Sequence, residues 1–142
     1  MNDKVEKNAN GNAEKEKTKF DWVTERFSCS LPAVFKTLRL QVEEDVKTRN
    51  SLRPNNSAYE FSVADTDDGF TVTLQAKEAR KSVKFSLAEH AILVRDNIGD
   101  PLLDVTLTFS ARGECQLIVN NEVRDFWQVR RMALEDLLFH SN

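Results

Sequence analysis

Apolar and polar side chains alternate through most of the segment 59–119, and this alternation is the strongest pattern in the chain. A period of two places every second side chain on one face of a β-strand. Polar turns such as 65–69 divide the segment into six short strands. Their apolar positions are Tyr59, Phe61 and Val63; Phe70, Val72 and Leu74; Val83, Phe85 and Leu87; Ile92 and Val94; Leu103, Val105, Leu107 and Phe109; and Cys115, Leu117 and Val119. Turn-length connections predict an antiparallel meander with one apolar and one polar face.

Helical spacing replaces the alternation on the N-terminal side of the strands. Apolar residues recur with the period of a helix at Leu31, Val34, Phe35, Leu38, Val42 and Val46. Ser30 is a suitable N-cap for this helix, and Pro32 is tolerated in a first turn. Asn50 and Pro54 mark its end. A shorter helical segment precedes it, with one apolar side formed by Phe20, Val23 and Phe27.

The segment after the strands is also predicted to be helical. We expect Asn120 or Asn121 to cap a helix that starts near Glu122. Its broad apolar stripe consists of Val123, Phe126, Trp127, Ala133, Leu134, Leu137 and Leu138. This stripe can cover the apolar face of the sheet together with the helices that precede the strands.

The order of elements predicts the α+β class: N-terminal helices, a six-stranded antiparallel β-meander sheet, and a C-terminal helix, with the apolar sheet face covered by helices from both ends. We expect residues 19–142 to form a single domain. Residues 1–18 are rich in Asn, Lys and Glu and poor in large apolar side chains, so a disordered N-terminal tail is expected there. The element order is similar to that of helix-grip lipid-binding domains and of the small acidic chaperones of secretion systems.

Charge and cysteine usage narrow the expected partners and location. The chain has 23 acidic and 20 basic residues, for a net charge of −3. Nucleic acid and anionic membranes repel an acidic chain, so neither is expected as a partner. No stretch resembles a membrane span or a secretory signal, which predicts a cytoplasmic location. In that compartment Cys29 and Cys115 are expected to be reduced thiols, with Cys115 facing the core.

The residues that could carry chemistry do not form a recognisable set. We expect His90 in an exposed turn and His140 at the end of the last helix, and neither has a nucleophile at a characteristic spacing. The acidic turn 65–69 lacks the glycine and the glutamate of a calcium loop at the required positions. The four glycines cannot form a phosphate-binding loop. We therefore expect no enzymatic activity, no cofactor and no metal site.

Three residues form the candidate partner surface: Trp127, Arg130 and Trp22. Trp and Arg are enriched among the residues that contribute most to protein interfaces. The alternative for Arg130 is that its aliphatic part lies on the edge of the core while its guanidinium pairs with an acid. The Ser- and Thr-rich sheet face, or an unpaired sheet edge, could also bind another protein or a second copy of the chain.

We favour a non-enzymatic protein-binding or adaptor module, which requires an exposed apolar surface or an open sheet edge. The alternative is a carrier of a small hydrophobic ligand, with an enclosed cavity between the sheet and the C-terminal helix. The walls of that cavity would be Phe61, Phe70, Phe85, Phe109, Phe126 and Trp127. An enzyme is the third hypothesis.

Overall fold

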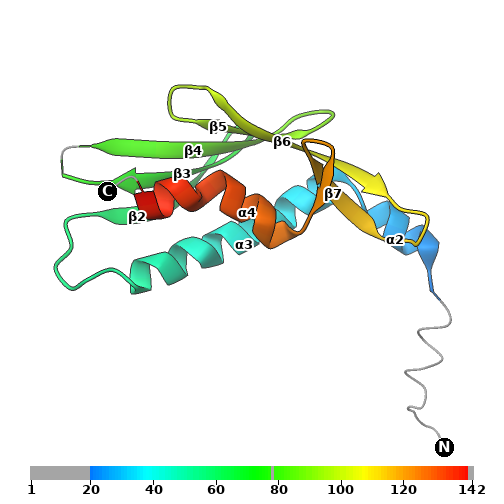
Figure 1. Cartoon of the computed structure of the whole chain (residues 1–142), viewed down its shortest axis with the longest axis horizontal. Coiled ribbons are helices and arrows are strands. Elements are labelled where there is room, and N and C mark those ends of the chain that lie inside the picture. The colour runs from blue at the N-terminus through cyan, green and yellow to red at the C-terminus, as the bar shows by residue number, and fades with distance from the viewer. Residues whose placement is uncertain (1–19, 78, 141–142) are drawn as a thin grey trace, which may run out of the picture.

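The computed structural model describes residues 20–77 and 79–140, so the tail expected at 1–18 lies outside the described residues. The elements are α2 (Trp22–Ser28), α3 (Leu31–Ser51), β2 (Glu60–Thr66), β3 (Gly69–Gln75), β4 (Arg80–Leu87), β5 (Ile92–Asp96), β6 (Pro101–Phe109), β7 (Cys115–Val119), β8 (Glu122–Arg124), α4 (Phe126–Glu135) and the π-helical turn η1 (Asp136–His140). The sheet is one layer, and α3 and α4 lie side by side in a second layer (Figure 1). The predicted α+β class is confirmed.

The described residues form a seven-stranded sheet in which the strands follow one another in sequence order. Each strand pairs antiparallel with the next, as between Phe70 and Phe85, so the predicted meander is confirmed. The strand missing from the prediction is β8. Asn120 and Asn121 have φ values of 54° and 66°, which suit a two-residue hairpin turn and which Asn tolerates. These residues therefore connect β7 to β8 instead of capping a helix, and α4 begins only at Phe126.

Local capping fixes where the two main helices begin. The Ser30 hydroxyl accepts a hydrogen bond from the Ala33 N–H at 3.3 Å, as the sequence predicts. At the start of α4 the Gln128 side-chain oxygen accepts a hydrogen bond from the Asp125 N–H at 2.8 Å. This reciprocal contact is part of a capping box, and the Asp-x-x-Gln spacing is visible in the sequence. The helix start near Glu122 was wrong because the hairpin occupies that segment.

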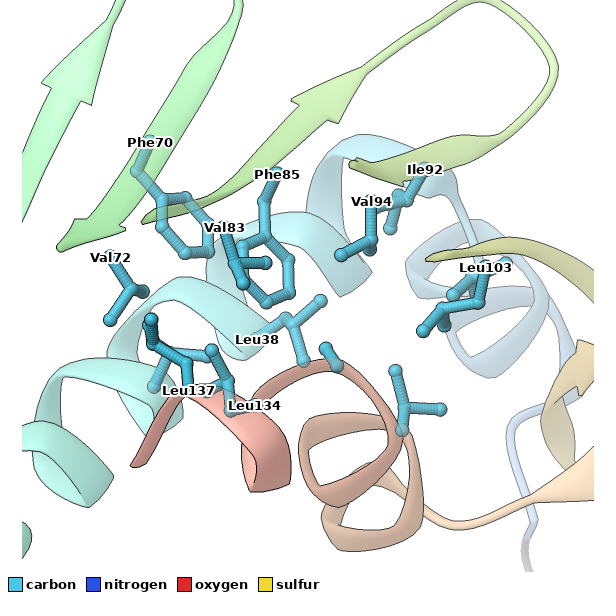
Figure 2. Close-up of a cluster of buried hydrophobic side chains, with 14 of the residues drawn as sticks. Leu38, Phe70, Val72, Val83, Phe85, Ile92, Val94, Leu103, Leu134 and Leu137 are labelled. Atoms are coloured by element: carbon cyan, nitrogen blue, oxygen red, sulfur yellow. The ribbon is translucent and has the colours of Figure 1, made fainter. Parts of the chain in front are cut away.

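The core lies between the sheet and the α3–α4 layer (Figure 2). The rings of Phe70 and Phe85 stack with their centroids 4.6 Å apart, and Leu38 of α3 and Leu134 of α4 project toward the same cluster. Most of the apolar strand positions predicted to face inward are buried. The residues at the margins are only half-buried, namely Tyr59, Val63, Leu87, Leu107 and Phe109. Cys115 is exposed because it stands at the outer end of β7.

Gly69 stands where β3 approaches the backbone of β4 very closely. A Cβ atom at this position would lie 1.8 Å from the carbonyl oxygen of Phe85. The glycine is therefore required by close backbone approach. The sequence placed this glycine only within the polar turn 65–69, and a turn pattern does not reveal a close backbone approach.

The edge of β2 that pairs with no other strand among the described residues is partly covered by side chains at, and just beyond, the end of α3. The Asn50 amide donates to the carbonyl of Phe61 at 2.8 Å and accepts from the N–H of Phe61 at 3.0 Å. Arg53 donates to the carbonyl of Tyr59. Neighbouring residues of an antiparallel strand alternate between bonding the partner strand and turning their backbone groups outward. Asn50 and Arg53 therefore occupy outward-turned groups that a further strand would use.

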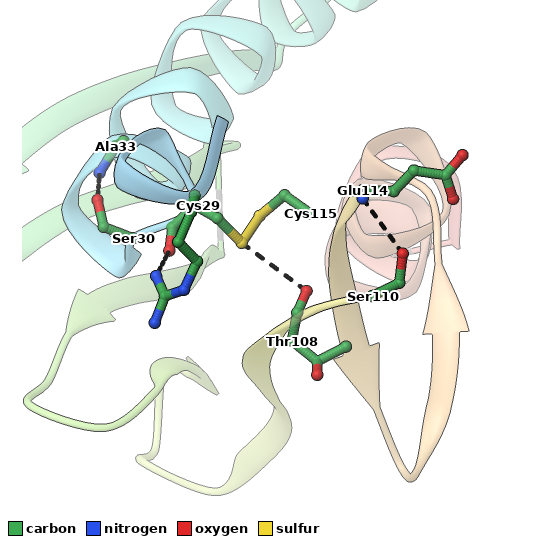
Figure 3. Close-up of a disulfide and its surroundings, with 8 residues drawn as sticks. Cys29, Ser30, Ala33, Thr108, Ser110, Glu114 and Cys115 are labelled. Atoms are coloured by element: carbon green, nitrogen blue, oxygen red, sulfur yellow. Dashed lines mark hydrogen bonds between the residues drawn. A yellow bond between two sulfur atoms is a disulfide. The ribbon is translucent and has the colours of Figure 1, made fainter. Parts of the chain in front are cut away.

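Cys29 and Cys115 form a disulfide, with their Cα atoms 5.3 Å apart, which corrects the prediction of two reduced thiols (Figure 3). Cys29 lies between α2 and α3, and Cys115 begins β7. The carbonyl oxygen of Thr108 lies 3.8 Å from Cys29 Sγ, a contact without a hydrogen bond because an oxidised sulfur carries no proton. The pairing was not predictable from spacing, since 86 positions separate the two cysteines and only the fold brings them together.

Candidate partner-binding surface

A groove of about 390 Å³ lies between the C-terminal half of α3 and the outer side of α4 and η1. Its apolar floor is formed by Leu134 and Leu138, which are almost fully buried. Its walls are formed by Leu52, Trp127 and Phe139, of which 67%, 52% and 59% are exposed. The groove therefore presents apolar surface to solvent between the two helices.

The helical geometry of α4 places Trp127 in this groove. Val129 and Ala133 are buried on the side of α4 that faces the core, and Phe126 packs against the margin of the core. At about 100° per residue, Trp127 lies at the edge of that buried stripe, next to the solvent-exposed face of the helix. The core is therefore filled without the Trp127 ring.

Arg130 lies in the groove but is held by two residues of α3. Its Nε donates to Asp45 Oδ2 and its Nη1 to Gln41 Oε1, each at 2.6 Å. Only 17% of the Arg130 side chain is exposed. The structure thus places Arg130 as the alternative interpretation expected, on the edge of the core and paired with an acid, where it joins α3 to α4.

Arg49 is a groove residue that sequence reasoning did not single out. Its Nε donates to the carbonyl of Leu138 at 2.8 Å. Its guanidinium carbon lies 5.7, 5.1 and 5.0 Å from the ring centroids of Tyr59, Phe61 and Phe139. Three aromatic rings and one carbonyl therefore fix the position of this cation. A helical repeat alone could not reveal this, because the rings come from β2, η1 and the segment before β2.

Arg131 and Glu135 complete the charged lining. Arg131 Nε donates to Glu135 Oε1 at 2.8 Å. This hydrogen bond and the charge of Arg131 hold the pKa of Glu135 below its ordinary value, and His140 contributes in the same direction. Both side chains are substantially exposed, so the pair is open to solvent and to a partner.

A second, smaller hollow of about 190 Å³ adjoins the groove and shares Trp127 with it. It is lined by Arg124, Met132 and several residues shared with the groove. The Arg124 Nη2 pairs with Glu122, whereas its buried Nε has no hydrogen-bond partner among residues 20–77 and 79–140. Trp127 therefore lines both hollows.

Trp22 does not belong to the same surface. It lies on α2, at the end of the molecule near the β6–β7 tip, while the groove lies between α3 and α4 (Figure 1). It is 62% exposed, and no residue of α2 is buried. Of the three candidate residues, the structure brings together Trp127 and Arg130 and leaves Trp22 apart.

The residues expected to line a carrier cavity are divided between the packed core and the surface, and the polar sheet face lies outside the groove. Phe61, Phe70 and Phe85 lie in the packed core, while Trp127 lies outside it, so the six aromatic residues expected to line a carrier cavity do not surround one space. On the polar sheet face Thr73 is buried between its strand neighbours Ser62 and Ser82.

His90 is exposed beside Glu89, and His140 lies near Glu135 at the end of η1. Within residues 20–77 and 79–140, no three His, Cys, Asp or Glu side chains gather as metal ligands. No helix in the same part of the chain combines the length and apolar character needed to cross a membrane.

Comparison of the chain with protein-family models, with curated proteins and with solved structures found no match.

Proposed function

We propose that the chain is a non-enzymatic protein-binding module that receives an apolar segment of a partner in the α3–α4 groove. One observation carries this proposal. The core is filled by other side chains, yet a half-exposed Trp127 stands beside an open apolar groove. Large exposed apolar side chains around a groove are typical of interaction sites.

The available apolar area is large enough to matter for binding. A Trp side chain presents up to about 250 Å², so the exposed 52% of Trp127 amounts to roughly 130 Å². Burying that area contributes about 3 kcal/mol at about 25 cal/mol per Å². A loss of this size on truncation would make Trp127 the main anchor of the interface.

Site-specific photo-crosslinking in the cells that make the protein tests this proposal. A benzophenone amino acid replaces Phe139 in the groove wall and, as a control, Ile98 in the exposed turn after β5, where 76% of the residue is accessible. We expect a crosslinked partner at position 139 and none at 98, and we expect Trp127→Ala to remove the product. Equal crosslinking in the presence of Trp127→Ala would show that the groove is not the binding site.

The location of the protein is a separate proposal. The sequence favours the cytoplasm, but the Cys29–Cys115 disulfide favours an oxidising compartment, since reducing systems keep cytosolic thiols free. We therefore propose an oxidising compartment as the location of the protein. Alkylation of free thiols at the moment of cell lysis separates the two locations: two modified cysteines would indicate the cytoplasm, and none would indicate an oxidising compartment.

A further inference from the structure

The charges that line the groove are not balanced. Three arginines and two acids line it, and the acids are already paired: Asp45 with Arg130 and Glu135 with Arg131. Among the described residues no carboxylate pairs with the third arginine, Arg49. The groove therefore has one positive charge that the described part of the chain leaves uncompensated.

Arg49 is also held in a fixed position. Its Nε is occupied by the Leu138 carbonyl, and its Nη2 is 3.5 Å from the Tyr59 hydroxyl. Its Nη1 makes no hydrogen bond to the described residues. A guanidinium that aromatic rings and a carbonyl hold in place loses little entropy when it binds, and its natural acceptor is a carboxylate.

We infer that the segment bound in the groove carries a carboxylate next to its apolar side chains, and that Arg49 receives this carboxylate. The inference rests on the proposed protein-binding function and specifies the partner. The apolar side chains lie on Leu134 and Leu138 beside Trp127, while the acid reaches the end of the groove where Arg49 and Phe139 meet. The partner is thus an acidic amphipathic segment.

The shape of the groove favours a peptide segment over a free fatty acid. Two contacts show that α3 and α4 run in the same direction: Asp45 pairs with Arg130, and Arg49, farther along α3, bonds Leu138 of η1, which continues α4. A groove between two aligned helices accepts a third helix along its length. A carrier of small ligands instead encloses most of the ligand surface, whereas Leu52 and Phe139 leave this groove open.

Selection from a phage-displayed library of random twelve-residue peptides tests the inference. The wild-type protein is expected to enrich peptides that combine large apolar residues with Asp or Glu. Trp127→Ala is expected to lose the enrichment. Trp22→Ala is the matched control, because it removes a Trp of similar exposure outside the groove, and it is expected to select the same peptides as the wild type. Arg49→Gln is expected to keep the apolar pattern and to lose the preference for acids.

A synthetic copy of one selected peptide then isolates the charge. Changing its acid from Glu to Gln should weaken binding to the wild-type protein about tenfold and should leave binding to Arg49→Gln unchanged. Arg49→Lys keeps the charge and should retain part of the preference. Thermal unfolding of each Arg49 variant verifies that the protein remains folded despite the lost bond to Leu138.

The outcomes separate the two proposals. Trp127-dependent enrichment without any acidic preference would overturn the role of Arg49 and leave the binding function standing. No enrichment, or enrichment that survives Trp127→Ala, would overturn both. Arg49-dependent binding of octanoate together with failure of every peptide would identify a small-ligand site instead.

Discussion

Removal of the Cys29–Cys115 disulfide tests how much this bond contributes to the stability of the fold and to the position of α2. The double variant Cys29→Ser, Cys115→Ser deletes the covalent link between the α2–α3 junction and β7. Because α2 has no buried side chain, few other contacts with the described residues hold it in place. We expect the variant to lose both stability and the fixed position of α2.

The loss of stability can be estimated from the length of chain that the bond closes. The cysteines are 86 positions apart, and a chain-entropy estimate for a loop of this length gives about 4.5 kcal/mol. Measured effects are usually about 2–4 kcal/mol, since the unfolded chain retains structure. We therefore expect the free energy of unfolding to fall by about 3 kcal/mol, with a midpoint roughly 10 °C lower.

Urea unfolding of the oxidised protein and the double variant measures this difference. The wild type in reducing buffer should match the variant, and the variant should not respond to reductant. In a Trp127→Phe background Trp22 is the sole tryptophan. Its fluorescence anisotropy should decay faster once the bond is absent, because α2 then moves independently.

Three results would refute this reasoning. Two titratable thiols in the native oxidised protein would show that the bond does not form. A change below about 1 kcal/mol would show that other contacts already restrain the closed loop. Unchanged anisotropy of Trp22 would show that α2 is held in place without the disulfide.

Two further predictions concern Asn50 and Glu135. Asn50→Ala removes both hydrogen bonds to the backbone of Phe61 and should lower the free energy of unfolding by about 2 kcal/mol. Asn97→Ala, in an exposed turn, is the control. Equal effects of the two variants in urea unfolding would contradict the role assigned to Asn50. Arg131→Gln should raise the pKa of Glu135 toward its ordinary value in an NMR titration, and an unchanged pKa would exclude Arg131 as the cause. Because the folded pKa of Glu135 is lowered, its contribution to stability is present above the unfolded pKa and is lost as the pH falls through the folded pKa.

The elements with strong local signals were predictable from the sequence. Alternation through Phe61, Val72 and Phe85 correctly indicated buried strand positions, since the period of two is a property of each strand alone. Ser30 was predictable as an N-cap because its hydroxyl bonds a backbone N–H only three residues farther along the chain. Asn120 and Asn121 were misinterpreted because Asn suits both a helix cap and a left-handed turn, and only the presence of β8 decides between them.

The candidate site depends on contacts between distant parts of the chain. Arg130 and Asp45 are 85 positions apart, and Arg49 and Leu138 are 89 apart. Helical spacing indicated that Trp127 and Arg130 lie near one stripe, but it could not show that α3 borders that stripe. The aromatic surroundings of Arg49 were invisible for the same reason, as was the pairing of Cys29 with Cys115.

The side chains of Asn50 and Arg53 affect whether molecules of this protein can join edge to edge in a concentrated solution. Open strand edges allow chains to join into ribbons and fibrils. Asn50 and Arg53 already occupy the backbone of Phe61 and Tyr59 at one margin of the sheet, and the strand at the opposite margin, β8, has only three residues. Within the described part of the chain neither margin offers a full-length template, so this arrangement opposes fibrillar growth.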